Sequence, residues 1–284
     1  MEKLITVVLP SYKSGKLVIS HIKKISRKIK IIIIENSKDR KLKKKIEKNY
    51  RNTKVYLQNN IGYGRAINFG ACHVETKYFL VMNPDTIIYK DTIKNLLTAA
   101  IKIKIFGALS PDQIQNKNKN KKNKKKIIEE KMLDGGAMLF HKETFKNIKG
   151  FDDNIFLYYE ENDYFHKCNN LNLKLYLIKN SFFYHSQKGD SSSAIYNNSK
   201  EKYYAYLLSG WHGQWSKFYY LKKYYGFTHS LYKCLPNLLG NIIQLFMKGI
   251  ILSKKTEYTY FKIEGLIASI IGLPSFKRSK YDKN

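Results

Sequence analysis

The chain has 284 residues, enough for one large α/β domain with an appendage or for two small domains. Hydrophobic residues make up 43% and charged residues 26%, which is typical of a globular protein with a sizeable core and excludes a disordered chain. The 52 Lys and Arg against 22 Asp and Glu give a net charge of +30, which favours nucleic acid, an anionic membrane or phosphorylated substrates as partners. Because these cations are mostly lysines scattered among Asn, Ile and Tyr, solvated surface charge explains the excess about equally well.

The three cysteines lie far apart without metal-binding spacing, which favours a reducing cytosol over a disulfide framework. The N-terminus begins with a strand-like segment at 4–9 and lacks the charged-then-apolar layout of a signal peptide. Residues 235–252 form the most apolar long segment. Three amide side chains and a lysine interrupt it, so we expect no transmembrane helix there.

Short apolar runs alternate with amphipathic or charged stretches over the first hundred residues, as in buried, mainly parallel strands separated by helices. The predicted strands are 4–9, 30–35, 55–57 and 78–82, and the predicted helices are a basic stretch ending at 28, 41–50 and 64–75. The architecture is therefore α/β, and ligands of such sheets bind at the carboxyl ends of the strands. Four polar segments fall there, namely Pro10-Ser11-Tyr12, Glu35-Asn36-Ser37, Asn59-Asn60 and Asn83-Pro84-Asp85.

The second half of the chain begins with a Lys/Asn-rich tract of low complexity, and we predict a mobile surface loop over 113–131. An ordered block follows, with segments at 134–140, 150–152 and 173–185. After about 193 the sequence is rich in aromatic residues and lysine, with apolar segments of helical spacing at 231–252 and 260–271. These helices are expected to pack on a core or to lie on a membrane interface, and the two roles are compatible.

A glycine-rich segment at 60–70 follows one predicted strand and opens a predicted helix, so its backbone could favour an anion. Ile67 stands where a dinucleotide-binding G-x-G-x-x-G pattern requires its third glycine, and the chain has no P-loop. A structural turn is the better explanation of this segment taken alone.

Asn83-Pro84-Asp85 closes the predicted strand 78–82, where a carboxylate can hold a hard divalent cation that also binds a diphosphate. Alternatively, Asp85 or Asp91 caps the helix that begins near residue 90. His185, at an aromatic strand end, is either a further metal ligand or a core histidine.

Glu160-Glu161-Asn162-Asp163, the acidic segment, places three carboxylates within one helical turn after the aromatic run 156–159. Crowded carboxylates repel and apolar neighbours raise a carboxyl pKa, and both effects suit a general base near neutral pH. A solvated helix start that favours the macrodipole is the structural alternative.

Together, these segments resemble family 2 inverting glycosyltransferases of the GT-A fold, in particular the bacterial rhamnosyltransferase-like branch. The resemblance covers about 4–190, in the segments 8–12, 35–37, 60–70, 83–85, 135–140, 150–152 and 156–163, and continues loosely at 215–218 and 222–226. It implies a GT-A nucleotide-diphospho-sugar transferase fold in 1–192, a Rossmann-like mixed sheet flanked by helices. A C-terminal helical appendage in 193–284 could associate with a membrane.

The resemblance also implies roles for individual residues. Glu161 would be the catalytic base, with Glu160 and Asp163 tuning or positioning it, and Asp85 and His185 would hold a divalent metal, Mg²⁺ or Mn²⁺. The donor would be bound by Pro10, Tyr12, Glu35, Asn60, Gly62, Arg65, Asn68, Asn83 and Asp85, and the acceptor side lined by Asp134, Gly135 and Gly136. Glu35 stands where the family usually has Asp, and Asn83 replaces the first acid of the two-acid metal motif.

The implied function is an inverting hexosyltransferase that moves a sugar from dTDP-rhamnose or a UDP-hexose to a glycan or lipid-linked acceptor in cell-surface polysaccharide synthesis. It would work in the cytoplasm, at the inner face of the cell membrane, in peripheral contact with anionic lipid and without nucleic acid. Three alternatives stay open: a sugar-nucleotide nucleotidyltransferase, a non-enzymatic nucleic-acid-binding protein and an inactive relative. The first of these should carry a glycine-rich loop with Arg and Lys after its first strand, of which 10–16 is only a fragment.

Overall fold

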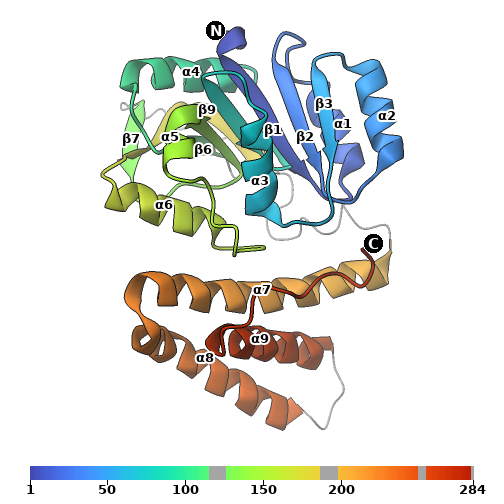
Figure 1. Ribbon diagram of the computed structural model, residues 1–284, viewed down its shortest axis with the longest axis vertical. Coiled ribbons are helices and arrows are strands. Elements are labelled where there is room, and N and C mark those ends of the chain that lie inside the picture. Colours follow the sequence, from blue (N-terminus) through green and yellow to red (C-terminus); the bar gives the residue numbers. More distant parts are fainter. Residues whose placement is uncertain (115–125, 186–197, 249–253, 283–284) are drawn as a thin grey trace. The chain divides into compact units, whose positions relative to one another are not determined.

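The computed structural model describes residues 1–114, 126–185, 198–248 and 254–282, and the chain divides into two compact units (Figure 1). The first unit comprises Met1–Ile61, Arg65–Phe151 and Tyr164–Ser191. The second comprises Gly62–Gly64, Asp152–Asp163 and Ser192–Asn284. Two short segments that precede the C-terminal helices in the sequence, Gly62–Gly64 and Asp152–Asp163, therefore pack with those helices.

The first unit is built on one mixed sheet, with nine strands among the described residues. Eight of them follow the order β3-β2-β1-β4-β8-β6-β9-β5, and β7 pairs with β9 outside this order. Its strands are β1 (Ile5–Ser11), β2 (Lys30–Glu35), β3 (Thr53–Leu57), β4 (Tyr78–Met82), β5 (Thr86–Ile88), β6 (Ala108–Gln113), β7 (Ile127–Glu130), β8 (Ala137–His141) and β9 (Leu175–His185). The strands β1 to β4 pair in parallel, while β8 runs antiparallel to β4 and β6. The α/β prediction is confirmed.

Burial explains why the apolar runs form the central strands. Every side chain of β1 and β4 is buried, as are all but the first of β2, because helices flank the sheet (Figure 1). The chain enters β1 through a short 3₁₀ helix, Glu2–Leu4, and the helices are α1 (Gly15–Ile22), α2 (Arg40–Asn49), α3 (Tyr63–Cys72), α4 (Thr92–Ile103), α5 (Lys142–Asn147) and α6 (Glu160–Asn170). The predicted strands 30–35 and 78–82 agree with β2 and β4 at both ends.

The Lys/Asn-rich loop predicted at 113–131 differs from the structure at its end. Ile127–Glu130 forms β7, which pairs antiparallel with β9 and sets Ile127 opposite Ile178. Ile127 is half-buried and packs on the sheet core, so the apolar pair at 127–128 outweighs the polar composition around it. Residues 115–125, the centre of the predicted loop, lie outside the described residues.

The second unit is helical, with α7 (Ser199–Tyr225), α8 (Phe227–Lys248) and α9 (Lys254–Ile270). Its core is formed by Leu207, Leu208, Trp211, Trp215, Phe261 and Ala268. The helices α7 and α9 pack closely because α9 has a glycine at the crossing: a Cβ on Gly265 would collide with the Trp211 backbone. Within the described ranges, no helix is both long and apolar enough to cross a membrane.

Candidate active site

Asp85 is buried between the end of β4 and the start of β5. The Asn83 N–H donates to the Gly136 carbonyl at 3.1 Å, and the Thr86 hydroxyl donates to the same carbonyl at 2.8 Å. Pairing of β5 with β9 sets Thr86 opposite His185. Asp85 is followed by a strand and not by a helix, so the explanation of Asp85 as a helix cap is wrong.

The N-cap position of α4 belongs to Asp91, whose side chain makes no capping hydrogen bond. His185 is the last residue of β9, and its side chain lies outside what the structure describes. The backbone register nevertheless brings it next to Asp85, since its partner Thr86 directly follows that residue.

The predicted acceptor segment lies beside the Asp85 segment. The Asp134 carboxylate accepts a hydrogen bond from the Gly136 N–H at 2.8 Å, and its carbonyl accepts one from the Ser110 hydroxyl at 3.3 Å. Because the Gly136 carbonyl is the shared acceptor for Asn83 and Thr86, the structure brings 83–86 and 134–136 together. The binding of an acceptor there stays a prediction.

His21 on α1 is a residue of this region that sequence reasoning missed. Its imidazole hydrogen-bonds the Pro84 backbone, which offers only a carbonyl, so the ring donates. Burial and the charge of Lys24 lower the pKa of His21 to about 4, although Asp85 and the Pro84 carbonyl act in the opposite direction. A neutral histidine therefore fixes the backbone just before Asp85. Its helical spacing from Val18 marks a buried face, which was the only signal in the sequence.

Glu35 is buried where β1 and β2 end side by side. Its carboxylate accepts a hydrogen bond from the Ser11 hydroxyl at 2.7 Å and others from the Ser37 N–H, at 2.8 Å, and the Ser37 hydroxyl. Burial raises the pKa of Glu35, and the bonds from Ser37 and Ser11 partly offset that rise. Both carboxylate oxygens thus hold the strand ends, whereas contact of Glu35 with a nucleotide stays a prediction.

The other predicted donor-binding residues lie near the same strand ends or on α3. Pro10 pairs with Ile34 inside the sheet, and the half-buried Tyr12 ring has the Lys13 ammonium 5.1 Å from its centroid. Asn60 precedes α3, and Arg65 is exposed in its first turn. Their contacts with a donor stay predictions.

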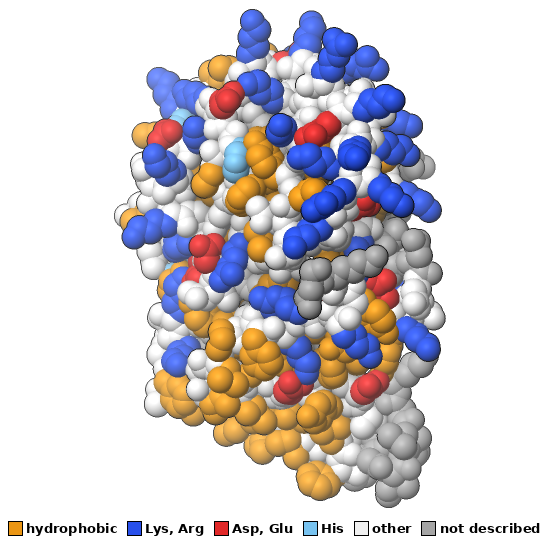
Figure 2. Space-filling model, turned by 45° about the vertical axis from the view of Figure 1, so that its right-hand side comes forward, with side chains coloured by type: hydrophobic (Ala, Val, Ile, Leu, Met, Phe, Trp, Pro, Cys, Tyr) orange, Lys and Arg blue, Asp and Glu red, His pale blue; other side chains and the backbone are white. Residues whose placement is uncertain are grey.

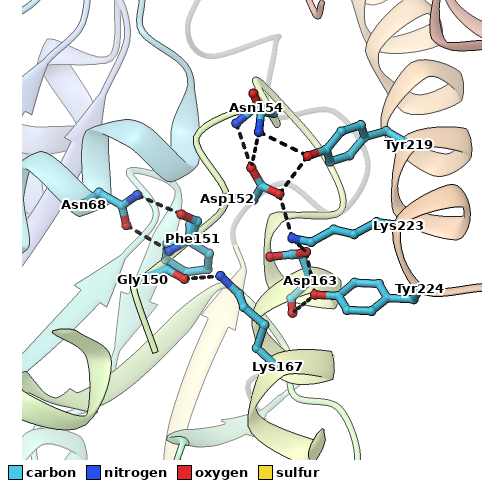
Figure 3. A network of polar contacts seen from close by, with 10 residues as sticks. All are labelled: Asn68, Gly150, Phe151, Asp152, Asn154, Asp163, Lys167, Tyr219, Lys223 and Tyr224. Atoms are coloured by element: carbon cyan, nitrogen blue, oxygen red, sulfur yellow. Dashed lines mark hydrogen bonds and ion pairs between the residues drawn. The ribbon is translucent and has the colours of Figure 1, made fainter. Parts of the chain in front are cut away.

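Asn68 has a clear structural partner in the first unit. Its amide donates to the Phe151 carbonyl at 3.0 Å and accepts from the Phe151 N–H at 2.9 Å (Figure 3). The Lys167 ammonium donates to the neighbouring Gly150 carbonyl at 2.6 Å. These bonds fix the chain just before it continues toward the acidic segment.

Gly62 belongs to the second unit and has a φ of +93°. A Cβ at this position would lie 2.5 Å from the Phe156 carbonyl oxygen, so close approach as well as φ requires glycine. The same carbonyl accepts a hydrogen bond from the Tyr63 N–H at 3.0 Å. The glycine turn is therefore held against the segment that leads into α6.

The acidic segment forms the first turn of α6, as the sequence predicted. It is not the solvated helix start of the structural alternative, because Glu160 and Asp163 are only 1% and 0% exposed. Glu161 is half-buried. Burial, followed by the charge of Glu161, raises the pKa of Glu160 well above its usual value. Within the described part of the chain, one Glu160 oxygen has no hydrogen-bond partner.

The backbone that enters α6 is strained. Tyr158 and Tyr159 have φ values of +68° and +69°, in the left-handed region that non-glycine residues rarely adopt. The Ser216 hydroxyl of α7 donates to the Leu157 carbonyl at 2.9 Å and helps to hold this conformation. Strained backbone is concentrated at functional sites, which supports a functional role for the residues that follow.

Lys223 of α7 joins two buried or partly buried carboxylates of the second unit (Figure 3). Its ammonium lies 2.5 Å from the Asp163 Oδ1 atom and 2.7 Å from the Asp152 Oδ2 atom. The Tyr224 hydroxyl also donates to Asp163, at 2.8 Å, and the Tyr219 hydroxyl to Asp152, at 3.0 Å. Helix α7 therefore binds the acidic segment through the ion pair and hydrogen bond to Asp163.

These contacts set the charges of the group. Burial raises the pKa of Asp152, but hydrogen bonds from Lys223, Asn154 and Tyr219 outweigh burial and hold it below its usual value. Burial lowers the pKa of Lys223, but its two carboxylate partners outweigh burial and hold it above its usual value. From the sequence, Lys223 was only one of several lysines near a possible membrane interface, within the looser part of the resemblance at 222–226, and its pairing with Asp152 and Asp163 was not predicted.

A mixed sheet flanked by helices, with carboxylates at its strand ends and at the start of a following helix, is the GT-A architecture of glycosyltransferases. The sequence matches the model of glycosyl transferase family 2 over residues 6–175, more than half of the chain, and the protein belongs to that family. No curated protein matches the sequence.

Solved structures share the fold at low sequence identity. S. aureus TarS is 15% identical, with a TM-score of 0.51 over 72% of this chain and 39% of that chain. GalNAc-T7 with UDP, GalNAc and Mn²⁺ is 15% identical, with a TM-score of 0.55 over 78% and 50% of the two chains. The mannosyltransferase PcManGT from Pyrobaculum calidifontis, in complex with GDP-Man and Mn²⁺, is 11% identical, with a TM-score of 0.56 over 94% and 87%. The chain spans less than two thirds of the TarS and GalNAc-T7 chains.

The residues around Asp85 fit a metal ion whose ligands come mainly from the phosphates of a bound substrate. Among the described side chains, no group of three or more His, Cys, Asp or Glu could hold a metal ion. Asp85 offers one carboxylate, and His185 is the neighbouring residue in the strand register. Mg²⁺ is commonly bound by one or two carboxylates together with substrate phosphates, and this donor set suits that arrangement.

Proposed function

We propose that this chain is an inverting glycosyltransferase that moves a sugar from a nucleotide-diphosphate donor to an acceptor hydroxyl. The observation that carries the proposal is the acidic segment. It holds a half-buried Glu161 between two buried carboxyl groups, directly after the strained backbone of Tyr158 and Tyr159, in a chain that belongs to glycosyl transferase family 2. Such an environment favours a base over a solvated surface residue.

Glu161 takes the proton from the acceptor hydroxyl as its oxygen attacks the anomeric carbon. The hydroxyl has a pKa far above neutral, so attack needs a positioned base. Glu160 is the buried neighbour whose negative charge is disfavoured, which keeps a second full charge away from Glu161. Asp163, paired with Lys223, positions the helix turn that carries the base.

Asp85 and His185 would hold a divalent cation, which neutralises the growing charge on the departing nucleotide diphosphate. Asp85 is kept in place by the hydrogen bonds of Asn83 and Thr86 to Gly136 and by His21 on the Pro84 carbonyl. Attack on the face opposite the leaving group inverts the configuration of the anomeric carbon.

The finer assignments belong to the same proposal. We infer a rhamnosyltransferase-like enzyme that uses dTDP-rhamnose or a UDP-hexose. Its acceptor is a glycan or lipid-linked glycan of a cell-surface polysaccharide, and it works at the inner face of the cell membrane. Support comes from the order of the motifs along the chain and from the uncharged Asn83 in the metal segment.

A test of the base assays transfer or hydrolysis of a panel of nucleotide sugars. Glu161→Gln should lower kcat by about 10²–10⁴-fold with little change in donor affinity, because the amide keeps the shape but cannot take a proton. The exposed Glu143→Gln is the matched control and should behave as wild type. Wild-type turnover in Glu161→Gln would remove Glu161 from the reaction.

Metal binding is tested by thermal unfolding with Mn²⁺, a nucleoside diphosphate, or both. Because the protein contributes few ligands, both together should stabilise the fold more than the sum of each alone. Asp85→Asn should abolish that synergy, whereas Asp91→Asn, at the N-cap of α4, should keep it. Equal synergy in Asp85→Asn, or chelator-resistant activity, would contradict the metal assignment.

A further inference from the structure

Helix α8 has two apolar faces, and the second unit covers one of them. Cys234 and Leu238 point inward and pack near Phe218 of α7 and Leu266 of α9. On the other face, five large apolar side chains are between 44% and 79% exposed. They are Tyr232, Leu235, Leu239, Ile243 and Phe246, here called the α8 stripe. Their spacing of three or four residues sets them along one side of the helix over about 20 Å.

The α8 stripe is longer than the pairs of exposed apolar residues elsewhere, such as Ile101 and Ile105. Figure 2 shows hydrophobic side chains gathered over the part of the second unit that contains α8, while Lys and Arg are spread over the first unit. In the first unit, Ile105, Met132 and Leu171 are comparably exposed, but they lie far apart in the sequence and form no stripe of five residues. A contiguous apolar surface on a soluble protein marks an interaction site.

Charge around the α8 stripe indicates the partner. Helix α8 contains Lys233 and Lys248 and no Asp or Glu. The Lys233 ammonium lies 5.9 Å from the ring centroid of Tyr232, a member of the α8 stripe. Lysines and aromatic rings beside an apolar helix face are the composition of helices that lie in a membrane interface.

A second copy of this chain fits the α8 stripe less well. A two-fold contact through α8 would bring the lysines of both copies together, and the helix has no carboxylate to pair with them. Anionic lipid headgroups supply the missing negative charge, and acyl chains cover the apolar side chains.

We propose that α8 docks this protein on an anionic membrane, with the α8 stripe inserted at the boundary between headgroups and acyl chains. The helix axis lies along the surface, because no helix among the described residues is suited to span a bilayer. Membrane docking rests on the proposed function in one respect: it would give the enzyme access to a lipid-linked acceptor. Membrane binding itself needs no catalysis, so the two proposals fail separately.

The test is co-sedimentation of the full chain with phosphatidylcholine vesicles, with and without phosphatidylglycerol. The wild type should bind the vesicles that contain phosphatidylglycerol and lose affinity as salt rises. The triple variant Leu239→Gln, Ile243→Gln, Phe246→Gln should bind at least about tenfold more weakly, because glutamine keeps the helix but removes the apolar area. The matched variant Ile105→Gln, Met132→Gln, Leu171→Gln should bind as wild type does.

Further measurements keep the outcome unambiguous. Lys233→Glu should weaken binding to the anionic vesicles without touching the apolar face. Retained hydrolysis of a soluble nucleotide sugar by the triple variant would show that its fold and active site are intact. No binding by the wild type, or equal binding by the triple variant, would overturn the proposal. The proposal would also be overturned if the wild type were a dimer that does not bind vesicles and the triple variant were a monomer.

Discussion

The pKa values of single residues in this fold depend on burial more than on residue type. Glu160 and Glu161 are neighbours in the sequence, yet the first is almost completely buried and the second is half-buried. Burial raises the pKa of Glu160, so the folded state binds its proton at a higher pH than the unfolded chain does. The protein therefore loses stability as pH rises above the usual glutamate range.

Glu160→Gln should raise the free energy of unfolding at pH 7 by at least about 1 kcal/mol, since the amide has the same shape without the buried charge. The gain should shrink as pH falls toward 4.5, where the unfolded carboxyl also becomes protonated. Chemical denaturation at both pH values measures this, with the exposed Glu143→Gln as control. A large loss of stability at pH 7 would mean that the Glu160 charge is compensated.

His212 of α7 is a second example at the same scale. Its Nε2 atom lies 2.9 Å from the Lys277 carbonyl, which can only accept, so Nδ1 is free to accept from the Ser275 hydroxyl at 3.0 Å. Burial and the charge of Arg278 lower the pKa of His212 to about 3. A neutral ring therefore pins the C-terminal segment to α7.

Because the folded pKa of His212 lies below the unfolded value of 6.5, its contribution is present above pH 6.5 and is lost as pH falls toward 3. One such group lowers the free energy of unfolding by about 2 kcal/mol between pH 7 and pH 5. His212→Gln should make the pH dependence of unfolding shallower by about that amount, whereas the exposed His229→Gln should leave it unchanged. Identical slopes in all three proteins would exclude a neutral buried His212.

At the scale of elements, α7 and α6 are joined by charge as well as by packing. Lys223 is the shared partner of Asp152 and of the completely buried Asp163. Removal of one member of a buried pair leaves the other charge uncompensated, which costs far more than the pair itself contributes.

Lys223→Met should therefore lower the free energy of unfolding by about 3 kcal/mol and reduce kcat through movement of the helix turn that carries Glu161. Lys223→Arg should recover part of both, because it keeps the charge. The neighbouring Lys222→Met removes an exposed lysine and should stay within about 0.5 kcal/mol of wild type. Full turnover in a stable Lys223→Met protein would contradict the positioning role.

Elements that depend on local pattern could be predicted from the sequence. The runs at 30–35 and 78–82 are apolar and long enough to be read as buried strands, and their polar ends mark the edge where Asp85 lies. The acidic segment at the start of α6 was likewise visible. Strand β7 was missed because its four residues adjoin a lysine-rich tract, and its pairing with β9 is a tertiary interaction.

The contacts of His21 and Lys223 could not be predicted either, because they are tertiary interactions. Their partners are 63 and 60 or more positions away, at Pro84, Asp152 and Asp163, and only the folded chain brings them together. The mobile-loop prediction at 115–125 and the side chain of His185 lie outside the described residues.

At the scale of the whole molecule, a net charge of +30 favours nonspecific attraction to polyanions. Duplex DNA binding, measured by fluorescence anisotropy, should weaken about 10³-fold or more between 50 and 200 mM salt, as expected for counterion release. Donor binding depends on local contacts and should change far less. Tight DNA binding that persists at high salt would instead support the nucleic-acid-binding alternative.

The short segments that belong to the helical unit have a consequence for how this protein can be divided or recombined. The chain changes unit at 61/62, 64/65, 151/152, 163/164 and 191/192. A fragment that ends near 192 would keep Asp163 but lack Lys223, so it should not fold as an independent module. A chimera between two relatives would need to exchange Gly62–Gly64 and Asp152–Asp163 along with the C-terminal helices. Glu161, the proposed base, would then be inherited with the helices and not with the sheet that carries Asp85.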